Sequence, residues 1–222
     1  MTTTQIIFFK ISTLSNLLPI ITLTTFYNKL NKPFKIFFLN LIIGNCNDLL
    51  GYVKQIFKFH FNFLIVGDIY HIIDYGVILY FFYILNNKKY LNRYLFIYFI
   101  GLVIQIIDWF FITKFKYNTI YSDVFLFSVC CYLYLDKINF IIINTKTLYI
   151  KSNWLLLFFI TMSIYYSYCI FTLSLYCLNI PLNIKIEPSL YSILNIANTL
   201  VNITLTIIFT KLFNRKGEYI II

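Results

Sequence analysis

Seven long runs of apolar residues, separated by short polar segments, set the pattern of this chain. The runs cover residues 6–27, 34–53, 63–85, 94–113, 119–135, 153–179 and 188–213. A helix needs about 20 mostly apolar residues to cross the hydrocarbon core of a bilayer, so each run predicts one membrane-spanning helix. The fifth run is the weakest, because it is short and carries Asp123. Residues 140–144 form a brief apolar stretch that is too short to span, and we expect it in a loop at the membrane interface.

Small and polar residues within most of the runs gather on one side of each predicted helix, at about 100° per residue. The sets that share a face are Asn40, Gly44, Asn47, Asp48 and Gly51; Asp68, His71 and Asp74; Gly101, Gln105 and Asp108; Ser163, Ser167 and Ser174; and Asn195, Asn198, Thr199, Asn202 and Thr206. A helix surrounded by lipid would not sort its polar groups in this way, so the stripes predict a bundle with a polar interior. We therefore expect Asn198→Leu to disturb folding more than Phe209→Leu does.

The stripes of Asn, Ser and Thr have a plain alternative interpretation, since such residues commonly hold membrane helices together. Acids differ, because an acid at the middle of a span costs about 3 kcal/mol on insertion scales and often marks a ligand site or an ion pathway. Followed along the alternating path of the chain, five acids fall in the outer half of the membrane. They are Asp48, Asp68, Asp74, Asp108 and Asp123. Asp48 and Asp74 are the deeper pair, whereas a place in the wet headgroup layer stays open for Asp68 and Asp123.

Composition and charge place the chain in the membrane. Of its 222 residues, 60% are apolar and 12% are charged, whereas a soluble domain is typically about 25% charged. The net charge is +10, but Lys and Arg lie mainly in short loops, which favours contact with anionic lipid headgroups and excludes nucleic acid as the expected partner. Twelve of these basic residues follow the odd-numbered runs and six lie elsewhere. By the positive-inside rule, the N-terminus is outside and the C-terminus is cytoplasmic.

The predicted fold is thus an all-α, seven-helix transmembrane bundle, a single polytopic domain over residues 1–222 in the inner membrane of the cell. We expect one ligand- or ion-binding site in its outer half. Its predicted residues are Asp48, Asp74, His71 and Asp108, with Asn198 and Asn202 opposite.

His71 lies one turn from both Asp68 and Asp74. A neutral His beside carboxylates can relay protons, bind a metal or form a hydrogen bond. A metal site usually needs more than one strong ligand at helical spacing, and His60 lies outside the runs, so we expect no metal. The chain has no H-E-x-x-H, G-x-S-x-G, P-loop, G-x-G-x-x-G or C-x-x-C motif. We therefore predict no catalytic residues and no cofactor, and we do not expect an enzyme.

Three classes of function fit this pattern. The leading hypothesis is a membrane sensor or ligand-binding module that takes a small cation, a proton or a polar ligand. The segments between the runs are short, so we expect its output to pass to a separate protein partner. The alternatives are a proton- or ion-coupled channel or transporter, and a lipid-modifying enzyme with Asp74 and His71 as acid and base.

A set of residues along the chain resembles the pattern of a family of small seven-span bacterial inner-membrane proteins. The set comprises the run Asn-Lys-Pro-Phe-Lys from Asn31 to Lys35, Asp48, Tyr70 and Asp74 with the aromatic residues up to Tyr83, Asp123, Trp154, Asn198 and Asn202. The family usually has Glu where this chain has Asp, and often a His near Leu194 that is missing here. The family has no established activity. The resemblance therefore implies seven helices and an outward-facing acidic cluster, and no particular chemistry.

Overall fold

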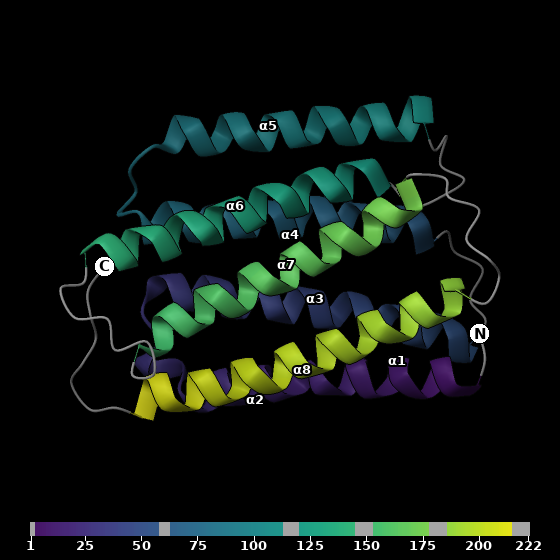
Figure 1. The fold of residues 1–222 in the computed structure, drawn as a ribbon, viewed down its shortest axis with the longest axis horizontal. Helices are drawn as coiled ribbons and strands as arrows, with labels where there is room; N and C mark the ends of the chain where they lie inside the picture. Colours follow the sequence, from purple (N-terminus) through teal and green to yellow (C-terminus); the bar gives the residue numbers. More distant parts are fainter. Residues whose placement is uncertain (1–2, 58–62, 113–119, 145–152, 178–185, 215–222) are drawn as a thin grey trace. The chain divides into compact units, whose positions relative to one another are not determined.

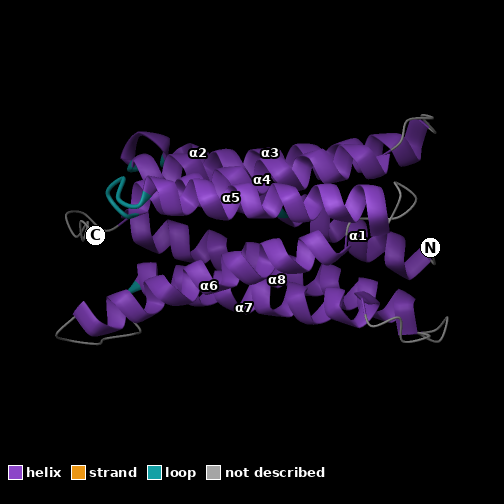
Figure 2. Ribbon diagram, turned by 90° about the horizontal axis from the view of Figure 1, so that it is seen from above, coloured by secondary structure: helices purple, strands orange, loops and turns teal. Residues whose placement is uncertain are grey.

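The computed structural model describes residues 3–57, 63–112, 120–144, 153–177 and 186–214. These residues are helical almost throughout and form no β-strand, which confirms the all-α prediction. The chain forms two compact units, one made by residues 1–29 and 127–221 and the other by residues 30–126. Figures 1 and 2 show the helices of both units. The single domain expected over residues 1–222 stays a prediction.

The first unit is built around its C-terminal helix. Its elements are α1 (Thr3–Ser15), α2 (Leu17–Thr25), the short 3-10 helix η1 (Tyr27–Lys29), the greater part of α6 (Ile120–Asn144), α7 (Trp154–Cys177) and α8 (Ile186–Asn214). Helix α8 packs along α1, α2 and α7 (Figure 1). Interlocking aromatic rings fill the unit: Tyr134 stacks on Tyr166 at 5.6 Å, and Phe158 lies 5.8 Å from Phe209.

The first predicted span is interrupted at Asn16, between α1 and α2. Pro19 has no backbone N–H to donate to the carbonyl of Ser15, so one bond of the helical ladder is missing there. The hydroxyl of Ser15 instead donates to the carbonyl of Ser12 at 2.6 Å. The sequence predicted one helix over residues 6–27, and the structure divides it.

The second unit consists of three consecutive helices and the start of a fourth. Its elements are α3 (Lys32–Phe57), α4 (Phe63–Leu85), α5 (Leu91–Ile107), the π-helical turn η2 (Asp108–Ile112) and the first residues of α6. Helix α4 packs against α3 and α5. Gly101 makes the approach of α5 to α4 possible, because a Cβ atom there would lie 2.7 Å from the ring of Tyr75.

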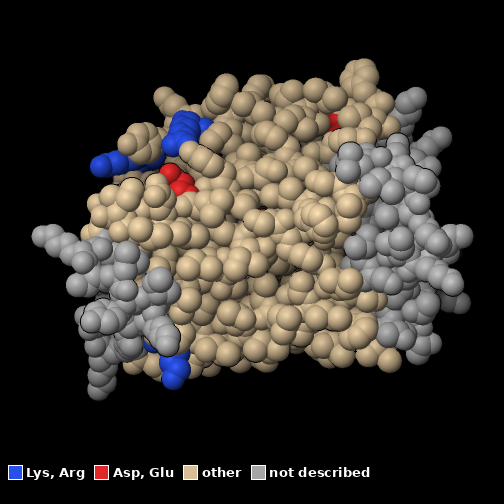
Figure 3. All heavy atoms as spheres, viewed as in Figure 1, with Lys and Arg blue, Asp and Glu red and all other residues tan. Residues whose placement is uncertain are grey.

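Six helical stretches of the described residues are long and apolar enough to cross a membrane. They are Ile7–Thr25, Val66–Leu85, Leu91–Ile112, Tyr121–Asn144, Trp154–Leu175 and Ser192–Asn214. Helix α3, which contains the predicted second span, is not among them, because its apolar residues are interrupted by Asn40, Asn45, Asn47 and Asp48. On the face shown in Figure 3, the visible Lys and Arg side chains lie towards the helix ends, and other residues cover the middle.

The predicted runs coincide with helices to within a few residues, apart from the break at Asn16 and one run that its helix extends well beyond. Helix α6 continues to Asn144, so residues 140–144 are not the interfacial loop that we expected. In the sequence, the fifth apolar run ends at two adjacent charged residues, Asp136 and Lys137. Lys137 is buried, and its ammonium group lies 5.1 Å from the centre of the Phe140 ring, so the helix continues past these charges.

Candidate functional site

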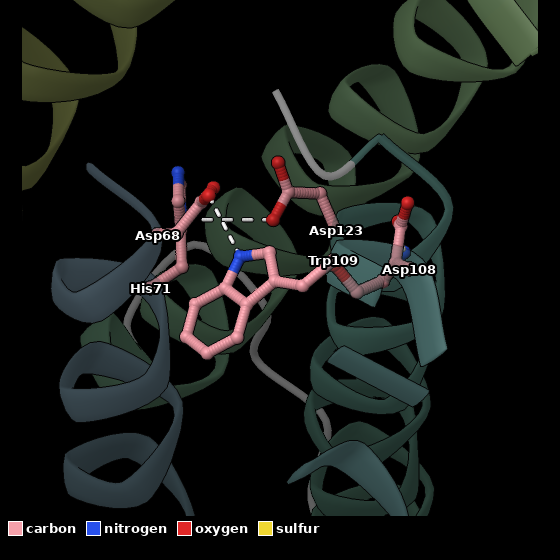
Figure 4. A network of polar contacts seen from close by, with 6 residues as sticks. Asp68, His71, Asp108, Trp109 and Asp123 are labelled. Carbon is pink, nitrogen blue, oxygen red and sulfur yellow. Dashed lines mark hydrogen bonds and ion pairs between the residues drawn. The ribbon is translucent and has the colours of Figure 1, made fainter. Parts of the chain in front are cut away.

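One end of the second unit gathers acidic, histidine and tryptophan side chains (Figure 4). Asp68 and His71 come from α4, Asp108 and Trp109 from η2, and Asp123 from the first turn of α6. We call these five residues the acidic cluster. Asp68, Asp108 and Asp123 are all buried, with 4%, 0% and 7% of their surface exposed. Three helical elements thus supply carboxylates to one place.

A side-chain hydrogen bond links α4 to η2. The indole Nε1–H of Trp109 donates to Oδ2 of Asp68 at 2.8 Å. An ionised acceptor makes such a bond roughly twice as strong as a neutral one. The bond holds the tryptophan ring across the space between the two elements, as Figure 4 shows.

His71 faces the carboxylate of Asp123. Its Nδ1 atom lies 3.9 Å from Oδ1 of Asp123, and 29% of the His71 side chain is exposed. This distance suits an ion pair or a pair joined through one water, and it is too long for a direct hydrogen bond. The pair brings an imidazole on α4 next to a buried acid on α6.

Asp108 has a structural role in the same cluster. Its Oδ2 atom accepts a hydrogen bond of 3.1 Å from the backbone N–H of Ser122, in the first turn of α6. The first N–H groups of a helix lack partners within it, and a carboxylate there also interacts favourably with the helix dipole. Asp108 therefore caps the start of α6, which is a structural role and needs no ligand.

The three carboxylates are close enough to act on one another. Asp108 interacts electrostatically with Asp68, and Asp123 interacts with both of them and with His71. Buried carboxylates without a full set of cations are costly to keep ionised together. Burial and mutual repulsion therefore act together on the three carboxylates of this cluster.

Asp74, which the sequence predicted as a principal site residue, lies one turn further along α4. It accepts a hydrogen bond from the amide of Asn40 on α3, and His71 is within electrostatic range of it. The hydroxyl of Tyr70 lies close to Gly44, where a Cβ atom would be 3.3 Å from it. Asn40 thus pairs with Asp74, and Gly44, which is later on α3, pairs with Tyr70, which is earlier on α4. The two helices are therefore antiparallel.

Asp48 lies further along α3, towards the level of the acidic cluster. It is half-buried and eight residues beyond Asn40, which is about 12 Å along a helix axis. Given the pairing of Asn40 with Asp74, Asp48 is at the level of Val66 and close to that of Asp68. The binding site that we expected Asp48 and Asp74 to share stays a prediction.

Asn198 and Asn202 bind the first helix instead of an acid. The amide of Asn198 donates to Oγ of Ser12 at 2.8 Å, and that of Asn202 donates to Oγ of Ser15 at 2.9 Å. Both also donate to Oδ1 of Asn16. These two residues belong to the first unit, so in the structure they serve helix packing, and their predicted place opposite the acids stays untested.

The predicted site does not include three residues of the acidic cluster: Asp68, Asp123 and Trp109. Asp68 and Asp123 were assigned a possible place in the headgroup layer, yet both are buried in protein. Trp109 was counted as apolar, although it is four residues after Gln105 and so lies on the polar face of its helix. The face of Gly101, Gln105 and Asp108 was predicted well, since all three are buried.

In the described part of the chain, no group of three or more His, Cys, Asp or Glu side chains is arranged to hold a metal ion. In comparisons with known proteins, no family model, no curated protein and no solved structure matches the chain. The resemblance to small seven-span bacterial membrane proteins stays a prediction. The acidic cluster is therefore the feature of the described residues that bears on function.

Proposed function

We propose that this chain is an integral membrane sensor, with seven spans and its N-terminus outside, that takes up a proton or a small cationic ligand at the acidic cluster. The observation that carries the proposal is the burial of Asp68, Asp108 and Asp123 together at one end of the second unit. Capping of α6 accounts for Asp108. Capping does not explain the burial of Asp68, which accepts a bond from Trp109, or of Asp123, which lies 3.9 Å from His71.

A proton fits this geometry better than a bulky ligand. The atoms of His71 and Asp123 lie 3.9 Å apart, a spacing at which one proton can be shared through a single water molecule. Asp74 extends the series by one turn beyond His71. In the proposed topology the cluster lies in the outer half of the bilayer, where it would respond to external pH and pass a conformational change to a separate protein partner.

Infrared difference spectroscopy tests the proposal. The protein, reconstituted in lipid nanodiscs, would be taken between about pH 8 and pH 4, across the usual range of His and carboxyl groups. We expect a carbonyl band of a protonated carboxyl group to appear, and Asp123→Asn to remove part of it. Asp136→Asn, an exposed acid further along α6, is the matched control. A band that is unchanged in Asp68→Asn and in Asp123→Asn would contradict the proposal.

A second candidate is a proton channel or transporter, favoured by the series that runs from Asp123 on α6 to His71 and then Asp74 on α4. Proteoliposomes with an internal pH dye separate the two functions. A sensor shows proton uptake without flux, whereas a transporter acidifies or alkalinises the lumen. Flux that is lost in His71→Gln would favour the second candidate.

A further inference from the structure

A tryptophan and a π-helical turn stand next to the buried acids, and neither has a role in the proposed function so far. Residues 108–112 form η2, in which the backbone bonds close wider rings than in an α-helix. Such turns are rare, and they are frequently found at functional sites. The turn follows α5 directly and carries both Asp108 and Trp109.

The two consecutive residues at the start of η2 are bonded to two different helices. Asp108 accepts from the backbone of Ser122 on α6, and Trp109 donates to Asp68 on α4. Successive residues of a helix point in different directions, so this pair reaches both neighbours at once. The two bonds therefore hold η2 between α4 and α6.

These two bonds differ in what can break them. The bond of Asp108 goes to a backbone N–H, which does not titrate, and it fixes the start of α6. The bond of Trp109 ends on Asp68, a buried carboxylate that interacts with that of Asp108. If Asp68 gains a proton, its bond to the indole changes from charge-assisted to neutral and loses about half of its strength.

We propose that Trp109 is the residue that reads the charge of the acidic cluster, and that its bond to Asp68 is a latch for η2. When Asp68 is ionised, the latch holds the turn in its π-helical form. When positive charge is taken up at Asp68, the latch weakens, η2 relaxes towards a regular α-helix, and the residues after Trp109 rotate. This inference rests on the proposed function, because it names how binding at the cluster becomes a conformational change.

The residues that would move are well placed to transmit the change. Phe110, Phe111 and Ile112 have 59%, 74% and 50% of their surface exposed. In a membrane such side chains contact lipid or another chain. A rotation of η2 would therefore alter the outer surface of the second unit, which a partner could detect.

Several titratable groups face the latch and will set its midpoint. His71 and Asp74 lie on the same helix as Asp68, Asp108 lies on η2, and Asp123 lies on α6. On α3, Asp48 is the acid closest to the level of Asp68. Changes at these groups should shift the pH at which the latch opens, while changes at Asp68 should abolish its opening.

The test uses Trp109 as its own probe. The chain has two tryptophans, so Trp154→Phe leaves a single indole in the full-length protein. Ultraviolet resonance Raman spectra of that protein in nanodiscs report the strength of the indole N–H hydrogen bond between about pH 8 and pH 4. We expect a strong bond at the higher pH and a weaker one at the lower pH. Asp68→Asn should give the weaker bond throughout, and Asp136→Asn should behave like the parent.

A second probe tests whether the turn follows the latch. The nitrile of 4-cyanophenylalanine in place of Phe111 should shift its stretching frequency with pH, and Trp109→Phe should abolish that shift while the carboxyl band still titrates. A carboxyl band that titrates with no change at Trp109 overturns the latch and leaves the proposed function standing. Absence of any carboxyl titration overturns both. If Asp68→Asn fails to fold, the Trp109→Phe comparison decides alone.

Discussion

At the scale of single residues, the structure separates acids that look alike in the sequence. Asp108 caps a helix, Asp74 accepts a bond from Asn40, and Asp68 accepts one from Trp109. Each contact is with a different element, and no spacing within one helix could reveal it. The chemistry of each carboxylate therefore depends on a neighbour that is distant along the chain.

The capping role of Asp108 predicts a graded response to substitution. Asp108→Ala removes the acceptor for the Ser122 N–H, and loss of a capping side chain costs about 1 kcal/mol. Asp108→Asn keeps an acceptor oxygen and should lose less. Thermal unfolding in detergent micelles measures the stability of both variants. Asp136→Ala is the control, because Asp136 is an exposed acid on α6. Equal losses for the Ala and Asn variants would show that the charge of Asp108 matters more than its capping bond.

At the scale of the helices, polar stripes and close contacts determine which faces meet. The α8 stripe faces α1, where Ser12, Ser15 and Asn16 receive its two Asn amides. The choice of Phe209 as a neutral comparison was wrong, because its side chain is fully buried and packs on Phe158. Phe209 is eleven residues, or three turns, beyond Asn198, so it lies on the same face of the helix.

A better comparison for Asn198 is Leu200, which is 59% exposed on the same helix. Asn198→Leu should lower the unfolding free energy by about 0.6 kcal/mol for each hydrogen bond lost, and by at most about 2 kcal/mol. Leu200→Val should have little effect. In a double-mutant cycle with Asn16→Ala, the two losses should be less than additive. Fully additive losses would mean that the contact between α1 and α8 contributes no coupling.

Gly101 and Gly67 provide a second pair of matched changes, on the two helices that pack together in the second unit. A Cβ atom at Gly101 would lie 2.7 Å from the Tyr75 ring, whereas one at Gly67 meets nothing within 4 Å. Gly101→Ala should therefore cost about 1 to 3 kcal/mol through overpacking. Gly67→Ala should be neutral or stabilising, because Ala has the higher helix propensity. The melting temperatures of the two variants in micelles decide, and a stable Gly101→Ala protein would mean that α5 packs less closely than described.

At the scale of the whole molecule, the open question is topology. Six stretches of the described chain could cross a membrane, and α3 is the seventh helix in the predicted path. The polar residues of α3 lower its apolar character, but protein neighbours can shield them: Asn40 is buried and bonded to Asp74. A span of this kind is stable only inside a bundle.

Reporter fusions test this topology. A reporter that is active only in the cytoplasm should work when fused after Lys89, in the turn between α4 and α5, and after Ile222. It should be inactive after Lys116. Twelve basic residues on one side against six on the other give the direction. An active reporter after Lys116, or an inactive one after Ile222, would mean that α3 does not span or that the orientation is reversed.

The sequence by itself determined where the helices lie and which of their faces are polar. The length of each apolar run sets the position of a helix, and helical periodicity sets its polar face. Both are local properties of the sequence. It could not separate apolar residues that face lipid from those that face protein, as Phe209 shows, since both environments are equally apolar. It also could not choose partners for polar groups. Only the tertiary structure joined Trp109 to Asp68 and Asp123 to His71, because those contacts connect different helices.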